Sequence, residues 1–493
     1  MNRDLLLSAC GPLREALTRA RYDIDSIVDL IGADAHAALS RHEPVPARRA
    51  SRSGGDLGQL IRLFLLDDDC PADGVAAALH PLDLDTAVAA GLVSRDGDTV
   101  RAELDLRPLD LGTGNRWALS DLDGSLRPRA TADDHVIGVG EASMTLLRGT
   151  PTAPAGTVLD VGTGCGIQAL RAADYAGTVT VTDINPRALT LTAATAALNG
   201  LDFEILEGSW FEPVAGRRFE RIVANPPFVV GEAKVTHSYR DSGLDLDGAS
   251  ELMISNAVDH LVPGGTAAML ASWLHVDGED WRHRVASWLP AHGVDAWIVQ
   301  RDVADPALYV GTWLRDGGAD PRDPATEARA NAWLDHLEEA GVDGIGFGFV
   351  YLRRTDAPSD ILCEDLRHGF EDPLGDEALA YFERLTWLRD HDVLTARFTV
   401  RPDTALERVY LPGEDGWSQV VARVHRGGGP QWQHDVDDLA ASLLAGMRAD
   451  GLPLEELLTL LAFANGEDED ELAAAAVPLV HALVRHGLIE PVR

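Results

Sequence analysis

Lysine is almost absent from this sequence. The 493 residues contain a single lysine, Lys234, and 79 acidic residues face 42 basic ones, which gives a formal net charge of −37. A charge of this sign repels a phosphate backbone at long range and disfavours extended nonspecific binding of nucleic acid. The clearest basic cluster, in RHEPVPARRASR, can offset this repulsion locally, although a solvated loop is the simpler interpretation. Its members are Arg41, Arg48, Arg49 and Arg52.

Cysteines are few and long apolar runs are lacking. The four cysteines, Cys10, Cys70, Cys165 and Cys363, lie far apart and match neither a metal-ligand nor a disulfide spacing, so we expect free thiols and no metal site. No apolar run approaches the ~18 residues that a membrane span needs. The first residues, MNRDLLLSACGPLREAL, are interrupted by charge and proline too early for a signal peptide. We therefore expect a cytoplasmic protein without a membrane partner.

The length predicts several domains. At about 150 residues per domain the chain should form roughly three, and its content of 45% hydrophobic and 25% charged residues is typical of folded protein. Composition and pattern place the boundaries near residues 1–130, 131–355 and 356–493.

The two ends of the chain share a pattern of helices followed by short strands. Residues 56–108 predict three short helices, a glycine stop at Gly91 and a hairpin turning at Asp96-Gly97, which is typical of a winged-helix-like module. Residues 436–463 and 468–487 repeat the helical part and end at Gly487, so we expect a mainly helical, winged-helix-like C-terminal module. Such modules bind nucleic acid or protein, and the scarcity of basic residues favours partner contact for the C-terminal one.

The middle of the chain alternates apolar, strand-like runs with helical stretches. Near-continuous apolar strands separated by helices indicate a parallel sheet covered on both faces, so we predict a doubly wound, Rossmann-like α/β domain. The predicted strands are TVLDVG, TVTVTD, ERIVAN, TAAMLAS, AWIVQRD and GFGFVYLRR.

Three glycines, Gly162, Gly164 and Gly166, follow the first of these strands and precede a helix. Glycines at this place allow a tight turn and bring backbone N–H groups close to a ligand at the helix N-terminus. A dinucleotide fingerprint requires its third glycine at position 167, where this chain has Ile167, and this argues against NAD. Asp183 ends the next strand, 183 − 162 = 21 residues after the first glycine, and one carboxylate there can accept both ribose hydroxyls.

The order of glycine loop, strand-end Asp183 and NPPF at residues 225–228 resembles the class I S-adenosylmethionine-dependent methyltransferases. NPPF is similar to the Asn-Pro-Pro-aromatic signature of their amino-methylating branch, which includes ribosomal-RNA guanine, DNA adenine and release-factor glutamine methyltransferases. HVIGVGEAS (residues 135–143) resembles the segment that closes over the cofactor. The resemblance covers roughly residues 131–355 and implies S-adenosyl-L-methionine as the cofactor.

By this resemblance, Asp160 and the glycine loop hold the methionine part of the cofactor, and Asp183 holds the ribose. The sequence departs from the family where an acidic residue commonly accepts the adenine amine: LEGSWFEPV has Ser209 and Trp210 there, so a hydroxyl, a backbone group and stacking are expected instead. The full set of expected cofactor contacts is Asp160, Gly162, Thr163, Gly164, Gly166, Asp183, Ile184, Ser209, Trp210 and Asn225.

Asn225, Pro226, Pro227 and Phe228 are the expected catalytic residues. The Asn225 side-chain oxygen and the Pro226 carbonyl can accept hydrogen bonds from a target N–H group and so align its lone pair for methyl transfer. The two prolines restrict the backbone, and Phe228 offers a flat face to a planar group. Tyr239, Arg240 and Asp241 fall in a loop where substrate contact and simple solvation are equally expected.

RNA is the first expectation for the acceptor, with a protein glutamine or a small metabolite as the alternative. An N-terminal module ahead of a methyltransferase favours RNA, whereas the acidic charge favours a protein glutamine or a small metabolite. The alternative from another class is a catalytically idle binding scaffold, against which the intact glycines, Asp183 and Asn225 argue.

Overall fold

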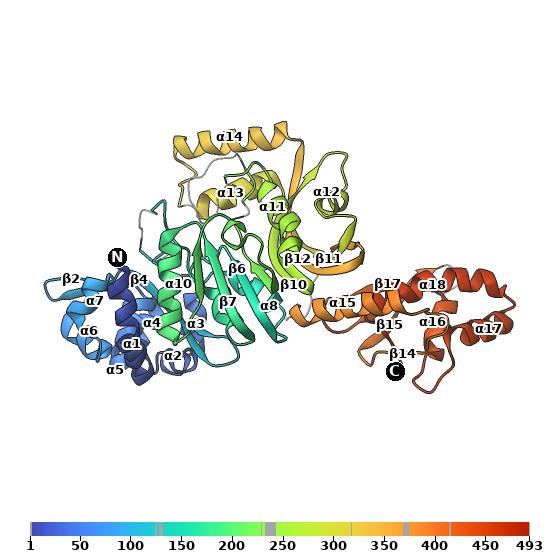
Figure 1. Ribbon diagram of the computed structural model, residues 1–493, viewed down its shortest axis with the longest axis horizontal. Helices are drawn as coiled ribbons and strands as arrows, with labels where there is room; N and C mark the ends of the chain where they lie inside the picture. Colours follow the sequence, from blue (N-terminus) through green and yellow to red (C-terminus); the bar gives the residue numbers. More distant parts are fainter. Residues whose placement is uncertain are drawn as a thin grey trace. The chain divides into compact units, whose positions relative to one another are not determined.

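The computed structural model describes residues 2–123, 126–127, 132–227, 229–231, 243–316, 318–367, 374–413 and 416–492 (Figure 1). Its contacts divide the chain into two compact units. Unit 1 comprises Met1–Leu147 and Thr152–Asp365, and unit 2 comprises Arg148–Pro151 and Leu366–Arg493. No helix within the described residues is long and apolar enough to cross a membrane.

The centre of unit 1 is a sheet in which the described residues form strands in the order β13-β11-β12-β10-β9-β6-β7-β8. The six predicted strands are all present, and β8 and β13 are additional. The strands are β6 (Ala155–Val161), β7 (Ala176–Asp183), β8 (Glu204–Glu207), β9 (Phe219–Ala224), β10 (Leu261–Val276), β11 (His292–Ala304), β12 (Val342–Pro358) and β13 (Asp360–Asp365).

The α/β architecture is as predicted, but the expectation of a parallel sheet is only partly correct. Strands β6 to β10 are parallel, whereas β12 runs antiparallel to both β10 and β11. The sheet is therefore mixed, and it extends past residue 355 to Asp365. An apolar run that is buried on both faces does not reveal strand direction, because burial and composition are the same for either direction.

Helices cover this sheet. Helices α11 and α12 contribute Met253, Ile254 and Trp281 to a core that also contains Leu159 of β6 and Ile222 of β9, while α10 packs against β7 and β8. The helices are α8 (Glu141–Gly149), α9 (Ile167–Ala172), α10 (Pro186–Asn199), α11 (Gly248–Ala257), α12 (Trp281–Ser287), α13 (Pro306–Asp316) and α14 (Pro324–Glu339), with 3₁₀ turns at Glu212–Val214 and Val258–His260.

The first 121 residues of unit 1 hold short helices and two small sheets. As predicted, α7 stops at Gly91, in the left-handed region (φ 77°), and β2 turns into β3 through Gly97 (φ 60°). The elements are α1 (Arg3–Ala20), α2 (Ile24–Ile31), α3 (Ala33–Leu39), α4 (Val45–Ala50), α5 (Gly55–Leu60), a 3₁₀ turn (Ser51–Ser53), a π-helical turn (Ile61–Leu65), α6 (Ala72–Leu79), α7 (Leu84–Ala90), β1 (Cys70–Pro71), β2 (Val93–Asp96), β3 (Thr99–Ala102), β4 (Leu104–Asp110) and β5 (Asn115–Asp121).

These N-terminal elements pack directly on α10. Asn185 caps that helix by accepting from Arg187 N, and Gly200 ends it in the left-handed region. At its far end Asn199 bonds to Trp117 of β5 in both directions: Oδ1 accepts from Trp117 N at 3.0 Å, and Nδ2 donates to Trp117 O at 2.7 Å. One compact unit therefore joins the N-terminal helices to the α/β sheet, with α10 as the shared element.

Asn199→Ala removes both hydrogen bonds, so the backbone N–H and carbonyl groups of Trp117 lose the Asn199 side chain as a partner. We expect the free energy of unfolding to fall by about 1–3 kcal/mol, because half-buried backbone groups lose their partner. Urea denaturation measures the change. Asn256→Ala, which loses only exposed contacts to Leu252 and Ser255, should change stability by less than about 0.5 kcal/mol; equal losses in the two variants contradict the role of Asn199.

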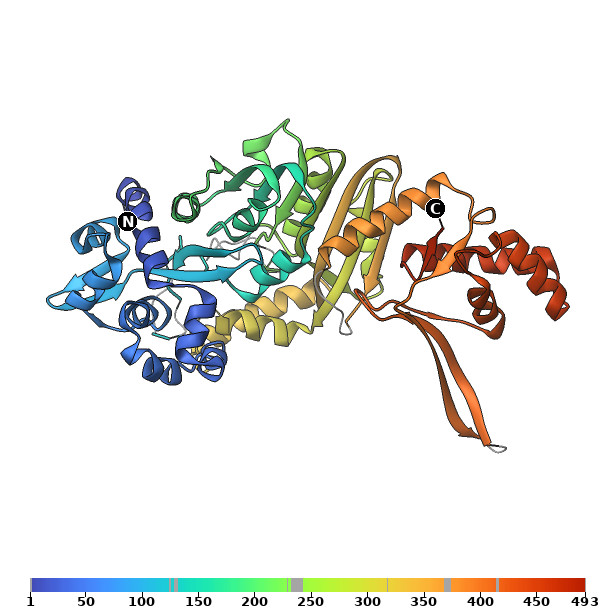
Figure 2. The ribbon, with the colours of Figure 1, turned by 90° about the horizontal axis from the view of Figure 1, so that it is seen from below.

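Unit 2 contains more strand than expected. Besides helices, it holds a long hairpin, β15–β16, which extends away from the helices of its unit (Figure 2). The elements are α15 (Gly375–Asp390), β14 (Phe398–Val400), β15 (Thr404–Gly413), β16 (Gly416–Arg426), β17 (Gln433–Asp435), α16 (Asp438–Gly446), α17 (Leu454–Asn465), α18 (Glu469–Arg485) and β18 (Ile489–Pro491).

The expectation of a mainly helical C-terminal module was therefore wrong for residues 398–435. Most of β15 and the first half of β16 are exposed on both faces, and Trp417 is 73% exposed. A strand without a buried face has no alternation of apolar and polar residues, which is the signal that sequence patterns rely on.

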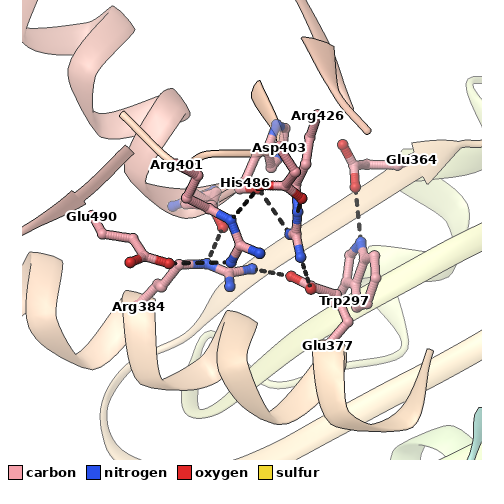
Figure 3. Close-up of polar contacts among 10 residues, drawn as sticks. Trp297, Glu364, Glu377, Arg384, Arg401, Asp403, Arg426, His486 and Glu490 are labelled. Carbon is pink, nitrogen blue, oxygen red and sulfur yellow. Dashed lines mark hydrogen bonds and ion pairs between the residues drawn. The ribbon is translucent and has the colours of Figure 1, made fainter. Parts of the chain in front are cut away.

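The interior of unit 2 is organised by ion pairs (Figure 3). Glu377 of α15 receives hydrogen bonds from Arg384, also of α15, and from Arg426 of β16. All three side chains are largely buried, and Arg426 is 6% exposed. Burial alone would raise the pKa of Glu377, but the hydrogen bond from Arg426 and the charges of both arginines outweigh it and lower the pKa.

Glu377→Gln leaves two buried arginines without their shared counter-charge. We expect a loss of about 3–5 kcal/mol in the stability of unit 2, because removing one partner of a buried ion pair is costly and Asp403, 3.7 Å from Arg426, compensates only part of the remaining charge. Urea unfolding of the full chain, followed by hydrogen exchange of peptides from unit 2, measures it. The control Glu490→Gln removes a partner of Arg401 that is 51% exposed and should cost less than about 1 kcal/mol. A loss no larger than this control's would refute the network's importance.

Candidate active site at the ends of three parallel strands

Strands β6, β7 and β9 end together at one edge of the sheet. Val161 of β6 pairs with Thr182 of β7 and with Ala224 of β9. Since these strands are parallel, their carboxyl ends bring three distant loops side by side. The residues that follow the paired positions are Gly162, Asp183 and Asn225.

The glycine loop has the conformation that its composition predicts. Gly162, Gly164 and Gly166 have φ values of 70°, 58° and 86°, which side chains other than glycine rarely adopt. A Cβ built on Gly162 or Gly164 meets no protein atom within 4 Å, whereas one on Gly166 would lie 3.2 Å from Thr192 of α10. Crowding thus adds to the need for glycine only at position 166, and the other two Cβ positions are open.

Asp183 connects this loop to the start of α10. Its Oδ2 accepts from Gly164 N and its Oδ1 from Asn185 N, both at 2.9 Å. Burial raises the pKa of Asp183, and these backbone N–H bonds act in the opposite direction. Each carboxylate oxygen can accept a second hydrogen bond, so Asp183 keeps the capacity to bind a diol.

Asp160 is the most deeply buried acid of the site, with 1% of its surface exposed. Thr163 Oγ1 donates to it at 2.7 Å. Burial raises the pKa of Asp160 to about 7; the hydrogen bond from Thr163 lowers it, and the charge of nearby Asp183 raises it further. The site therefore contains two neighbouring acids: Asp160, whose pKa is about 7, and Asp183, which accepts hydrogen bonds from the N–H groups of Gly164 and Asn185.

Asn225 lies half-buried directly after β9. Its Nδ2 is 3.5 Å from Ser143 Oγ of α8, a distance at the limit of a hydrogen bond. Within the described part of the chain, no group donates to Asn225 Oδ1 or to the Pro226 carbonyl. Both oxygens can therefore accept a hydrogen bond without breaking one made by the described residues.

Gln168 is a residue that sequence reasoning missed. It belongs to α9, and its Nε2 donates to the Ser143 carbonyl at 2.8 Å. The contact ties α8, and with it the HVIGVGEAS segment, to the helix that starts at the glycine loop. Its position two residues after Gly166 was the only available signal.

The segment after β8 reaches the same edge. Gly208 N donates to the Asp183 carbonyl at 3.0 Å, and Thr182 Oγ1 donates to the Trp210 carbonyl at 3.3 Å. Trp210 has φ 50°, a strained value for a bulky residue. Ser209 thus directly follows Gly208, which is hydrogen-bonded to Asp183. Ile184, the residue after Asp183, is 63% exposed.

Some expected residues lie outside the described part: Phe228, Tyr239, Arg240 and Asp241. Among the residues that the structure does describe, no three His, Cys, Asp or Glu side chains are grouped so that they could hold a metal ion.

Comparison with known protein families identifies the domain that contains this edge of the sheet. Residues 137–274 match the family described as "Methyltransferase small domain". The chain therefore contains a methyltransferase small domain. This confirms the resemblance drawn from NPPF and the glycine loop, and with it S-adenosylmethionine as the cofactor of this domain. Residues 19–103 and 379–491 match two families, each described as a domain of unknown function.

Individual proteins with similar segments are also known. A release factor glutamine methyltransferase of Deinococcus radiodurans is 38% identical over 122 residues, which is 22% of this chain and 42% of that protein. A ribosomal RNA small subunit methyltransferase C of Salmonella arizonae is 34% identical over 137 residues, which is 27% and 36%. The matched part thus spans less than half the length of these relatives. The solved T. thermophilus 16S rRNA methyltransferase with AdoMet and guanosine is 18% identical, with 50% of this chain and 63% of that chain covered and a TM-score of 0.28.

The raised pKa of Asp160 predicts a specific pH dependence of stability in the cofactor-free protein. The folded chain keeps this proton up to pH of about 7, whereas the unfolded chain releases it near 3.8. The stabilising contribution is complete below pH 3.8 and is lost as pH rises to about 7. Relative to Asp160→Asn, which cannot titrate, the wild type should lose up to roughly 4 kcal/mol across this range. Urea midpoints of both proteins at several pH values test this, and a constant difference would rule it out.

Proposed function

We propose that this chain is an S-adenosylmethionine-dependent N-methyltransferase that transfers a methyl group to a planar amino or amide nitrogen. The observation that carries the proposal is the position of Asn225. It directly follows β9, next to the glycine loop, and its Oδ1 receives no hydrogen bond from the described residues. An amide oxygen held at that place can accept a hydrogen bond from an N–H group of the substrate, and NPPF is similar to the signature of methyltransferases that act on such nitrogens.

Asp160, Thr163 and the loop glycines would hold the methionine part of the cofactor, and Asp183 the ribose. The open Cβ positions of Gly162 and Gly164 and the unused lone pairs of Asp183 support this assignment. When bound, S-adenosylmethionine supplies a methyl group on a positively charged sulfur. Ile184, Ser209 and Trp210, which flank Asp183, are proposed to surround the adenine.

Asn225 and Pro226 act on the acceptor. Accepting N–H bonds at Asn225 Oδ1 and at the Pro226 carbonyl keeps the nitrogen lone pair out of conjugation and directs it at the methyl carbon. The same oxygens stabilise positive charge that develops on nitrogen. Pro226 and Pro227 fix the backbone so that this geometry exists before the acceptor binds.

The acceptor class is weighed by charge. The basic cluster that could favour RNA is partly neutralised within unit 1, because Arg48 pairs with Asp68 at 2.7 Å and Arg41 pairs with Glu43 at 3.3 Å. Together with the net charge of −37, these ion pairs favour an acceptor nitrogen on a protein or a small molecule over one on RNA. One named relative acts on a release-factor glutamine and another on ribosomal RNA, so both classes belong in the test.

The regions on either side of the α/β sheet, residues 1–130 and residues 366–493, are proposed to position the acceptor; the C-terminal boundary moves from the expected residue 355 because β12 and β13 continue the sheet to Asp365. The helices and the β2–β3 hairpin before Ala102 support a winged-helix-like module at the N-terminus.

Labelled S-adenosylmethionine and cell extract separated into RNA, protein and small molecules test the proposal directly. We expect label in one fraction and, by mass spectrometry, a new methyl group on nitrogen. A methyl on oxygen or carbon, or no transfer to any fraction, would overturn it.

Asn225→Ala should lower turnover roughly 100-fold or more, since one oriented transition-state contact is worth about 3 kcal/mol. Affinity for S-adenosylmethionine, measured by calorimetry, should stay within about a factor of three. Asn225→Asp keeps an acceptor oxygen and adds a negative charge, so it should retain part of the activity. A wild-type rate in Asn225→Ala would show that NPPF has another role.

A further inference from the structure

The chain just after NPPF is buried but does not pair with a neighbouring strand. Val229 and Val230 are 7% and 0% exposed and have no strand conformation. Buried backbone N–H and C=O groups require partners, and in regular sheet a neighbouring strand supplies them. Here the partners of Val230 must come from elsewhere.

Two aromatic side chains provide them. The Val230 N–H donates to Tyr309 Oη at 2.7 Å, and the Val230 carbonyl accepts from Trp333 Nε1 at 3.0 Å. The same indole lies against the next residue, since a Cβ on Gly231 would be 3.0 Å from Trp333 Nε1. We call this pair the Tyr309–Trp333 clamp.

The clamp is itself rigidly supported. Tyr309 lies on α13 and Trp333 on α14, two helices that follow β11 in the chain, precede β12 and pack on each other (Figure 1). Tyr309 is 2% exposed; its ring meets Trp333 edge-on at 6.0 Å and stacks on Phe347 of β12 at 5.7 Å. The clamp therefore connects the segment after NPPF to β12, two strands away from β9 in the sheet, through packed aromatic rings.

Asn225 lies between two anchors. On one side β9 holds it through the sheet, and on the other the clamp holds Val230. Pro226 and Pro227, two of the four residues between Asn225 and Val230, have a fixed φ, which reduces the freedom of the chain to absorb a shift at Val230. We propose that Tyr309 and Trp333 are positioning residues of the acceptor site, which aim Asn225 without contacting the acceptor. This inference rests on the proposed N-methyl transfer.

Single-atom and single-ring changes test the clamp. Tyr309→Phe removes only the hydroxyl that Val230 N–H uses, and Trp333→Phe removes the indole donor. Two control variants lose the same kinds of hydrogen-bonding group elsewhere in unit 1. Tyr22→Phe loses a hydroxyl that donates to Leu106 O at 2.9 Å, and Trp297→Phe loses an indole that donates to Glu364 at 2.8 Å (Figure 3).

With the extract fraction that the wild type methylates, both clamp variants should lower kcat about 10-fold. Their KM for the acceptor should change less than threefold, and their affinity for S-adenosylmethionine less than twofold. The double variant should fall no further than about 20-fold, because both changes release the same segment. The controls should stay within twofold of the wild-type kcat. Wild-type kcat in the clamp variants, or an equal fall in the controls, overturns the inference.

Hydrogen exchange separates this inference from the proposed function. In both clamp variants the amide of Val230 should exchange at least 10-fold faster than in the wild type, while peptides from β6 and β7 keep their rates. Unchanged exchange at Val230 overturns the clamp even if methyl transfer is confirmed. Faster exchange supports the clamp even if the wild type labels no fraction, an outcome that would instead refute the proposed function.

Discussion

The carboxylate of Asp183 holds together the two loops that follow β6 and β7. It accepts one N–H from the glycine loop, at Gly164, and one from Asn185, which caps α10. Through that helix the N-terminal elements are attached, since Asn199 at its far end bonds to Trp117 of β5. One side chain thus links the candidate cofactor loop to a helix that is shared by the sheet and the first 121 residues. The N-terminal region is accordingly part of the same compact unit.

Two buried acids, Asp160 in unit 1 and Glu377 in unit 2, have pKa values shifted in opposite directions. In unit 1, burial is the largest influence on Asp160 and raises its pKa to about 7. In unit 2, Glu377 is also buried, but two arginines reach it and its pKa is lowered. Acidification therefore favours folded unit 1 through Asp160 and weakens unit 2 through Glu377 as the pH falls below about 4.5. Burial penalises both carboxylates, and the presence of a cation decides the direction of the shift.

The sequence predicted the parts of the fold whose signal is local. Apolar runs ending in glycine, aspartate or asparagine located β6, β7 and β9, and the glycine stop at Gly91 located the β2–β3 hairpin. Two kinds of element were missed for physical reasons. Strands β8 and β13 lie at the edges of the sheet and are short, and β15–β16 is exposed on both faces, so none of them has a strong buried pattern. The reversed direction of β12 was missed because direction leaves no trace in composition.

For the candidate site, sequence order and strand ends indicated Gly162, Asp183 and Asn225, because parallel strands place such residues at one edge. The supports of these residues could not be found in this way. Ser143 lies 82 residues from Asn225, and the partners of Val230 lie 79 and 103 residues further along the chain. A side chain that bonds to a backbone group needs no matching residue type at the other end, so neither sequence position reveals the pairing. The one local signal is the density of aromatic residues at Tyr309, Trp313 and Trp333, which by itself indicates only a core. Only the structure shows that two of these residues, Tyr309 and Trp333, bond to the backbone of Val230 in the segment that follows NPPF.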